Sequence, residues 1–259
     1  MRAFIMEIKR GAGLRMVIAA GVVFAVMLFS CRSYLPMAYS RQNTSYDVMY
    51  DAIYKSGLYA VIIIAAAYTA AGTYIEDERS GYLKYLLSRE GITRFVLRRF
   101  LAVTLCGAAA VLIGETAFMM LCDSLFPIED VPYHYTFSRH IMQTLEYENP
   151  RAFIFVTLLL HTPLSMAMAA LALAVSVCVK NLYVTYISPI IFLCMLSLVP
   201  DAGYAGRMAS AALFGFDAAA WYFGGDGFGP YMALTALVLC VSLIVFALGV
   251  RRYMGAVTK

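Results

Sequence analysis

The stretch EDERSGYLKYLLSREGITRFVLRRF, from Glu76 to Phe100, decides how this chain folds. Of the 20 Lys and Arg and the 16 Asp and Glu residues of the chain, ten fall in these twenty-five positions. Long apolar runs with almost no charge lie on both sides. A charged block between two such runs is typical of a connection that stays in water while its neighbours cross a bilayer.

The composition of the whole chain agrees with a membrane environment. The hydrophobic fraction is 62% and the mean hydropathy is +0.75 over 259 residues, whereas soluble domains have about 45–50% apolar residues. The six cysteines contain no CxxC pair and lie in or at the ends of apolar runs, which indicates small core residues. A disulfide between Cys31 and Cys122 is left open, because both end apolar runs near one membrane face.

Six apolar segments are long enough to be membrane-spanning helices, each of which needs about 20 apolar residues. We predict an all-α integral membrane protein, residues 1–259 forming a single transmembrane domain. Residues 200–230, which contain GGDGFGP, read as short re-entrant-like helices before the last span. The six predicted spans are Leu14–Cys31, Gly57–Ile75, Phe100–Cys122, Ala152–Val179, Tyr183–Val199 and Tyr231–Val250.

The basic residues fix the expected orientation. If the N-terminus is cytoplasmic, the inside segments carry fourteen Lys and Arg and the outside segments carry six. Because basic residues stay preferentially on the cytoplasmic side, this distribution predicts that both termini are inside. The net charge of +4 is then a sign of topology and of contact with lipid headgroups, and we expect no nucleic-acid partner.

The two segments that precede the first and second spans have helical patterns of their own. Residues 1–13 predict a helix lying in the membrane interface, with a frayed cationic tail as the alternative. Thr44 followed by Asp47 is a helix-start signature, and a tyrosine stripe follows it at every fourth position. We therefore expect one helix over 45–75 that projects outward. The interfacial residues are Met1, Phe4, Ile5 and Ile8, and the stripe is Tyr46, Tyr50 and Tyr54.

The charged block itself predicts a short cytoplasmic helix over Arg79–Leu87, a break at Gly91 and a cap at Thr93 for the third span. Such a helix, aromatic on one side and charged on the other, requires something to pack against. The residue pattern alone leaves two alternatives, a protein partner and the lipid headgroups.

The run ERSGYLKYLLSREGITRFVLRRFLA resembles the segment after the second membrane helix in permease subunits of type 2 ABC exporters. The family pattern there is an acidic-basic pair, Gly, a leucine pair, Pro or Gly, a Ser/Thr-Arg pair and a basic residue. This chain has Glu78-Arg79, Gly81, Leu86-Leu87, Gly91, Thr93-Arg94 and Arg99 in those places, with Gly91 where Pro is common and Arg99 where Lys is common.

In that family the segment is the coupling helix, which docks on an ATP-binding subunit. The resemblance implies a bacterial inner-membrane permease without catalytic residues, two partner ATPase chains that hold ATP and Mg²⁺, and a second permease chain, identical or homologous. It also implies export of an amphipathic or apolar substrate, such as a peptide, an antibiotic or a lipid-like molecule. The implied coupling residues are Glu78, Arg79, Gly81, Tyr82, Leu83, Leu86, Leu87, Arg89, Gly91 and Arg94.

Two ionisable residues fall inside predicted spans, where such groups are functional hypotheses by default. Glu115 lies about 10 Å and His161 about 14 Å below the same membrane face, at about 1.5 Å per residue. They could form a polar pair on a translocation path, or each could reach water or a backbone carbonyl separately. His134 and His140, in an outer loop, match no metal-site spacing, and we expect no metal site.

Other functions remain as alternatives. An ATP-independent channel or secondary transporter would usually carry more ionisable groups in its spans and internal repeats. A membrane anchor subunit would share the composition but would not need an amphipathic cytoplasmic block. The sequence has no GxxxxGK[ST] phosphate loop, no GxSxG and no HExxH, so an intramembrane hydrolase receives little support.

Overall fold

The computed structural model of the chain describes residues 2–33, 44–54, 58–126, 149–197 and 228–257. Every element in this part of the chain is an α-helix, as the hydrophobic patterns predict. In chain order the helices are α1 (Arg2–Gly11), α2 (Leu14–Ser30), α3 (Ser45–Tyr54), α4 (Leu58–Ala70), α5 (Thr73–Arg79), α6 (Tyr82–Glu90), α7 (Ile92–Leu125), α9 (Pro150–Val179), α10 (Leu182–Ser197) and α13 (Phe228–Val257).

Within the described residues, four helical stretches are long and apolar enough to cross a membrane, namely Ala60–Arg79, Ile92–Leu125, Arg151–Val179 and Tyr231–Ala256. A fifth is added if α1 and α2, which are bent by 46° at the intervening break, are counted as one span. The apolar part of α10, Leu182–Met195, is shorter. The last residues of the predicted fifth span, most of the segment 200–230, and His134 and His140 lie outside the described residues.

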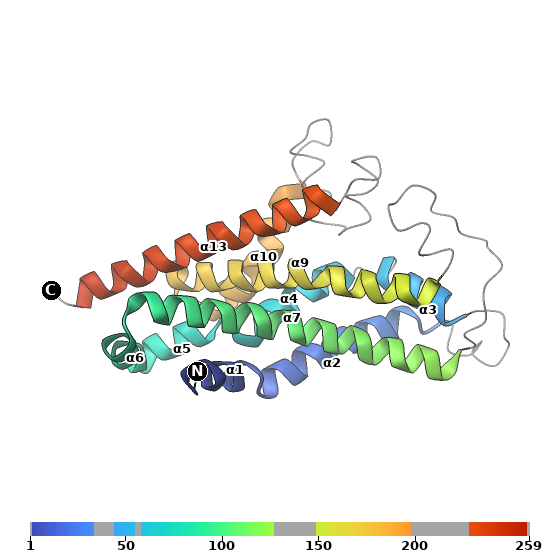
Figure 1. The fold of residues 1–259 in the computed structure, drawn as a ribbon, viewed down its shortest axis with the longest axis horizontal. Helices are drawn as coiled ribbons and strands as arrows, with labels where there is room; N and C mark the ends of the chain where they lie inside the picture. Colours follow the sequence, from blue (N-terminus) through green and yellow to red (C-terminus); the bar gives the residue numbers. More distant parts are fainter. Residues whose placement is uncertain (1, 34–43, 55–57, 127–148, 198–227, 258–259) are drawn as a thin grey trace.

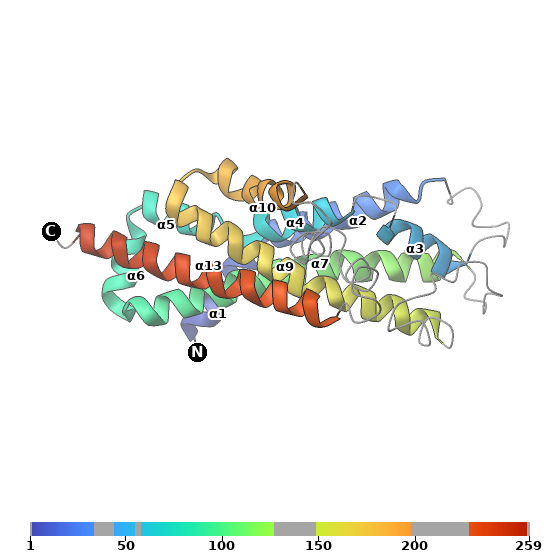
Figure 2. The ribbon, with the colours of Figure 1, turned by 90° about the horizontal axis from the view of Figure 1, so that it is seen from above.

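The helices run roughly along one long axis (Figures 1 and 2). α7 and α9 lie side by side at the centre, with α2 and α4 packed against α7 and α13 packed against α9. The N-terminus and the C-terminal end of α13 lie in the same half of the bundle as α5 and α6, whereas α3 lies at the opposite end. The charged block is therefore at one end of the bundle, close to both termini.

Small residues let the central helices approach closely. A Cβ built at Gly107 of α7 would lie 2.8 Å from the Cβ of Ala169 and 3.0 Å from the carbonyl oxygen of Ala66. Both distances are shorter than normal contacts, so only glycine fits between α4 and α9 at this level. Runs of small residues at helical spacing allow this kind of packing between membrane helices.

A methyl group at Gly114 should destabilise the bundle. Its Cβ would lie 2.6 Å from the carbonyl oxygen of Ala20 and 2.9 Å from the Cβ of Val23, so α2 and α7 would have to separate. We expect Gly114→Ala to lower the free energy of unfolding by about 1–3 kcal/mol, the usual cost of overpacking. The measurement is denaturant unfolding in mixed micelles.

The matched control for this prediction is Gly21→Ala on α2. No atom lies within 4 Å of a Cβ built at Gly21, and alanine in a helix interior is favoured over glycine by about 1 kcal/mol. Gly21→Ala should therefore be neutral or stabilising. Equal destabilisation by both variants would show that the α2–α7 contact is not the cause.

The single helix expected over 45–75 is interrupted. Its start is confirmed, because Thr44 and Asp47 exchange hydrogen bonds at 2.8 Å between their side chains and 3.0 Å from the Thr44 amide. Residues 55–57 lie outside the described part, and a second interruption separates α4 from α5 at Ala71 and Gly72. At Gly72 a Cβ would lie only 2.2 Å from the hydroxyl of Tyr186, so α10 approaches where the helix breaks.

Two further expectations concern side chains near this helix. The ring of Tyr46 lies 6.5 Å from the ring of Phe153, centroid to centroid, and packs against the core. The side chains of Tyr50 and Tyr54 lie outside the described residues. Cys31 and Cys122 are both buried, and the thiol of Cys31 donates to the carbonyl of Val48 at 3.2 Å. No disulfide joins these two cysteines.

Candidate functional site

Two glycines in the left-handed region delimit the charged helix α6. Gly81 precedes it with φ 74° and Gly91 follows it with φ 77°. Only glycine adopts such angles at little cost, so the chain turns sharply on both sides of α6. The helix begins at Tyr82 because Gly81 separates it from Arg79, which ends α5. The cap of α7 is Gly91, so the predicted cap at Thr93 is wrong.

The leucines of α6 face the interior of the chain. Leu83, Leu86 and Leu87 are all buried and belong to the main hydrophobic core. Their positions at i, i+3 and i+4 place them on one side of the helix. They hold α6 against the bundle and present no surface to a partner.

The opposite side of α6 is exposed and carries two stacked tyrosines. Tyr82 is 47% exposed and Tyr85 is 55% exposed, and their rings stack with centroids 6.0 Å apart. Lys84, Ser88 and Arg89 of the same helix are exposed as well. Tyrosine and arginine are both enriched at protein interfaces relative to the rest of a protein surface.

Glu78 and Arg79 do not point towards this exposed face. Glu78 forms an ion pair with the ammonium of Lys180, and a guanidinium nitrogen of Arg79 donates to the carbonyl of Lys180 at 3.2 Å. Lys180 ends α9 with φ 51°, the only described residue other than glycine with a positive φ. Its ammonium also lies 5.8 Å from the ring centroid of Tyr253 in α13. This contact therefore joins α5, the α9–α10 connection and α13.

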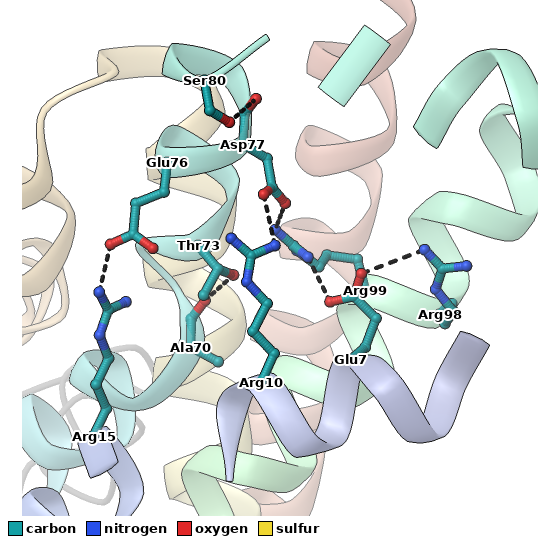
Figure 3. A network of polar contacts seen from close by, with 10 residues as sticks. All are labelled: Glu7, Arg10, Arg15, Ala70, Thr73, Glu76, Asp77, Ser80, Arg98 and Arg99. Carbon is teal, nitrogen blue, oxygen red and sulfur yellow. Dashed lines mark hydrogen bonds and ion pairs between the residues drawn. The ribbon is translucent and has the colours of Figure 1, made fainter. Parts of the chain in front are cut away.

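A chain of alternating charges links α1 to both flanks of α6, and Figure 3 shows all of its members except Glu90. Its carboxylates come from three different helices, and its guanidiniums come from α7 and α1. From one end to the other it runs Glu90, Arg98, Glu7, Arg99, Asp77 and Arg10. We call these six residues the ion-pair chain.

The central member of the ion-pair chain is fully buried. Arg99 is 0% exposed, donates to Glu7 at 2.5 Å and also pairs with Asp77, which is 1% exposed. Asp77 receives a second guanidinium, that of Arg10, at 2.6 Å. A charge so deeply buried is tolerated only when paired and hydrogen-bonded. Beside it, Arg15 and Glu76 form a more exposed pair at 2.5 Å.

The sequence pattern did not reveal the ion-pair chain. Arg99 was expected only as a basic residue that opens the third span, and Glu7 was not singled out. The available signal was the spacing of Glu7 and Arg10, one turn apart on the same helix. The ion-pair chain attaches α1 to the rest of the protein. On this helix, Ile8 packs against the core, whereas Ile5 is 44% exposed. The predicted apolar face of α1 is thus divided, and Met1 lies outside the described residues.

Glu115 and His161 form the polar pair that their depths allowed. Nδ1 of His161 lies 2.6 Å from Oε1 of Glu115, and both side chains are buried between α7 and α9. The other carboxylate oxygen, Oε2, has no hydrogen-bond partner among the described residues. Close by, the hydroxyl of Tyr231 in α13 donates to the carbonyl of Leu160 at 2.5 Å.

No group of three His, Cys, Asp or Glu residues is placed to hold a metal ion among the described residues. Comparison with protein-family models, curated proteins and solved structures found no match. The function must therefore be argued from the exposed face of α6, the ion-pair chain and the buried Glu115–His161 pair.

Proposed function

We propose that this chain is the permease subunit of an ATP-driven exporter of the type 2 ABC class, and that α6 is its coupling helix. The observation that carries the proposal is the orientation of α6: its leucines are buried in the chain, while Tyr82 and Tyr85 stack on the outside. The resemblance of residues 78–99 to the family pattern supports the same assignment.

The contacts of α6 suit it to transmit force to the long helices. Its inner face is fixed by leucines, and its last residue, Glu90, pairs with Arg98 in the second turn of α7. On its N-terminal side, Glu78 is linked to Lys180 at the end of α9. A displacement of α6 would therefore move α7 and α9, the two helices at the centre of the bundle, together with it.

The remaining parts of the proposal follow from the resemblance. Two ATP-binding subunits would hydrolyse ATP with Mg²⁺. A second permease chain, identical or homologous, would pair with this one in the bacterial inner membrane, and each chain would have six spans and cytoplasmic termini. The cargo would be amphipathic or apolar. Glu115 and His161 would lie on or beside its path, because a buried polar pair in an apolar bundle is costly unless it has a role.

The proposal is tested by capture of an ATPase on the full-length chain in mild detergent. Wild type should retain an ATP-binding subunit with measurable ATPase activity. The double variant Tyr82→Ala, Tyr85→Ala should retain at least about tenfold less of this subunit, because interface tyrosines are frequent binding hot spots. Polar substitutions of Leu86 or Leu87 would not test docking, because both side chains are buried in the core and such changes would disturb folding.

Tyr183→Ala is the control, since this tyrosine is 79% exposed and belongs to α10, which packs against α9 and α4. It should capture as much ATPase as wild type. If wild type captures no ATPase, the exporter proposal fails, and an ATP-independent channel or an anchor subunit becomes the better explanation.

A further inference from the structure

All the carboxylates of the charged block are paired within the chain, whereas some of its cations are exposed and unpaired with described residues. Each of its four carboxylates is engaged within the chain: Glu76 with Arg15, Asp77 with Arg10 and Arg99, Glu78 with Lys180, and Glu90 with Arg98. Of the six cations of the block, Arg98 and Arg99 belong to the ion-pair chain and Arg79 donates to the carbonyl of Lys180. The three that are left are Lys84, Arg89 and Arg94. They are exposed and form no ion pair with another described residue.

These cations lie beside the tyrosine stack. Tyr82, Tyr85 and Arg89 recur at three- and four-residue spacing and so share one side of α6. Lys84 lies next to Tyr85, and Arg94 follows in the first turn of α7, directly after the turn at Gly91. We call these five residues the tyrosine–cation face. It presents two aromatic rings and three positive charges, and the carboxylates near it are already paired within the chain.

The position of this face argues against lipid headgroups as its contact. A helix that lies on a membrane inserts its apolar side into the boundary of the acyl chains, but the apolar side of α6 is buried in the protein. In addition, α7 has 34 residues, which is about 51 Å at 1.5 Å per residue and exceeds a hydrocarbon core of about 30 Å. The charged first turns of α7 are about 10 Å long by the same rise, so α7 is long enough to carry α6 beyond that core.

We propose that the tyrosine–cation face binds a protein groove that is lined by acidic residues at its rim and accepts the tyrosine stack between them. The inference rests on the proposed function and specifies the partner: the ATP-binding subunit should carry this acidic groove. Attraction between opposite charges would fix the register of docking and speed association, while the rings would supply the buried contact.

The experiment measures binding of the captured ATP-binding subunit, purified separately, to the full chain in nanodiscs that contain only zwitterionic lipid. Lys84→Glu, Arg89→Glu and Arg94→Glu should each weaken binding by about tenfold or more, because opposed like charges cost several kcal/mol. The control is Lys9→Glu, because Lys9 is an exposed cation on α1 that forms no ion pair with another described residue; it should change affinity less than about twofold. Raising the salt from about 0.1 M to about 1 M shortens the Debye length from about 10 Å to about 3 Å, so wild-type binding should weaken more than that of the variants.

The outcomes separate this inference from the proposed function. If the ATPase binds all three reversed variants as tightly as wild type, the acidic groove is wrong while the exporter assignment stands. If the reversals matter only in nanodiscs that also contain phosphatidylglycerol, the face binds anionic headgroups and the inference is overturned. If wild type binds no ATPase at all, both fall. Rescue of Arg89→Glu by one Glu→Arg or Asp→Arg change in the partner groove would support the inference most directly.

Discussion

Replacing Asp77 with asparagine should lower the free energy of unfolding by about 3–5 kcal/mol, because it leaves buried charge without its partner. Asp77 is 1% exposed and is shared by Arg10 and by Arg99, which is 0% exposed. Without the carboxylate, Arg99 retains only Glu7 as a counter-ion. The neutral amide has nearly the same shape, so packing is unchanged and the loss reports charge alone. Denaturant unfolding in mixed micelles measures it.

The neighbouring residue provides the matched control. Glu76 is also a carboxylate paired with an arginine, but the side chains of Glu76 and Arg15 are 33% and 34% exposed. Exposed pairs contribute about 0–1 kcal/mol, so Glu76→Gln should be close to wild type. If the two amide variants destabilise the chain equally, burial of the ion-pair chain is not what makes Asp77 important.

Removing the imidazole of His161 should have an effect of similar size in the other half of the bundle. His161→Leu leaves the fully buried carboxylate of Glu115 without the contact at 2.6 Å, and its second oxygen already has no hydrogen-bond partner among the described residues. Breaking a buried pair by removing one partner costs about 3–5 kcal/mol. Denaturant unfolding in mixed micelles compares His161→Leu with wild type, and Tyr231 is unchanged in both.

The double variant Glu115→Leu, His161→Leu separates a structural role from a role in transport. Apolar replacement of a whole buried pair is often neutral or stabilising, so the double variant should recover most of the stability that His161→Leu loses. Under the exporter proposal, we expect it to assemble with the ATPase and yet fail to export cargo, because Glu115 and His161 would no longer supply polar groups to the proposed path. Normal export by this folded variant would show that the pair serves packing only.

The sequence by itself determined the features that depend on local pattern and on the solvent. Apolar runs of sufficient length predict helices whatever they pack against, so the all-α class and four of the predicted spans agree with the described helices. Thr44 and Asp47 form the predicted cap, because a cap involves only residues three apart. The fixed rise of a helix places Glu115 and His161 at similar depths, so the sequence showed that they could meet. It did not show that their two side chains face each other.

Only the tertiary structure decided which side chains of the charged block face inward. In the sequence, Leu86 and Tyr85 are neighbours that both carry large, mainly apolar side chains, and no local rule states which one the rest of the bundle covers. The same holds for charge: Arg99 and Arg94 both precede the apolar part of α7, yet one is buried and the other is exposed. The difference arises because Glu7 and Asp77 are brought to Arg99 from 92 and 22 residues away. The packing of α1 against α7 places Glu7, and the packing of α5 against α6 and α9 places Asp77. Long-range pairing of this kind depends on how helices meet, which the period of a single helix does not contain.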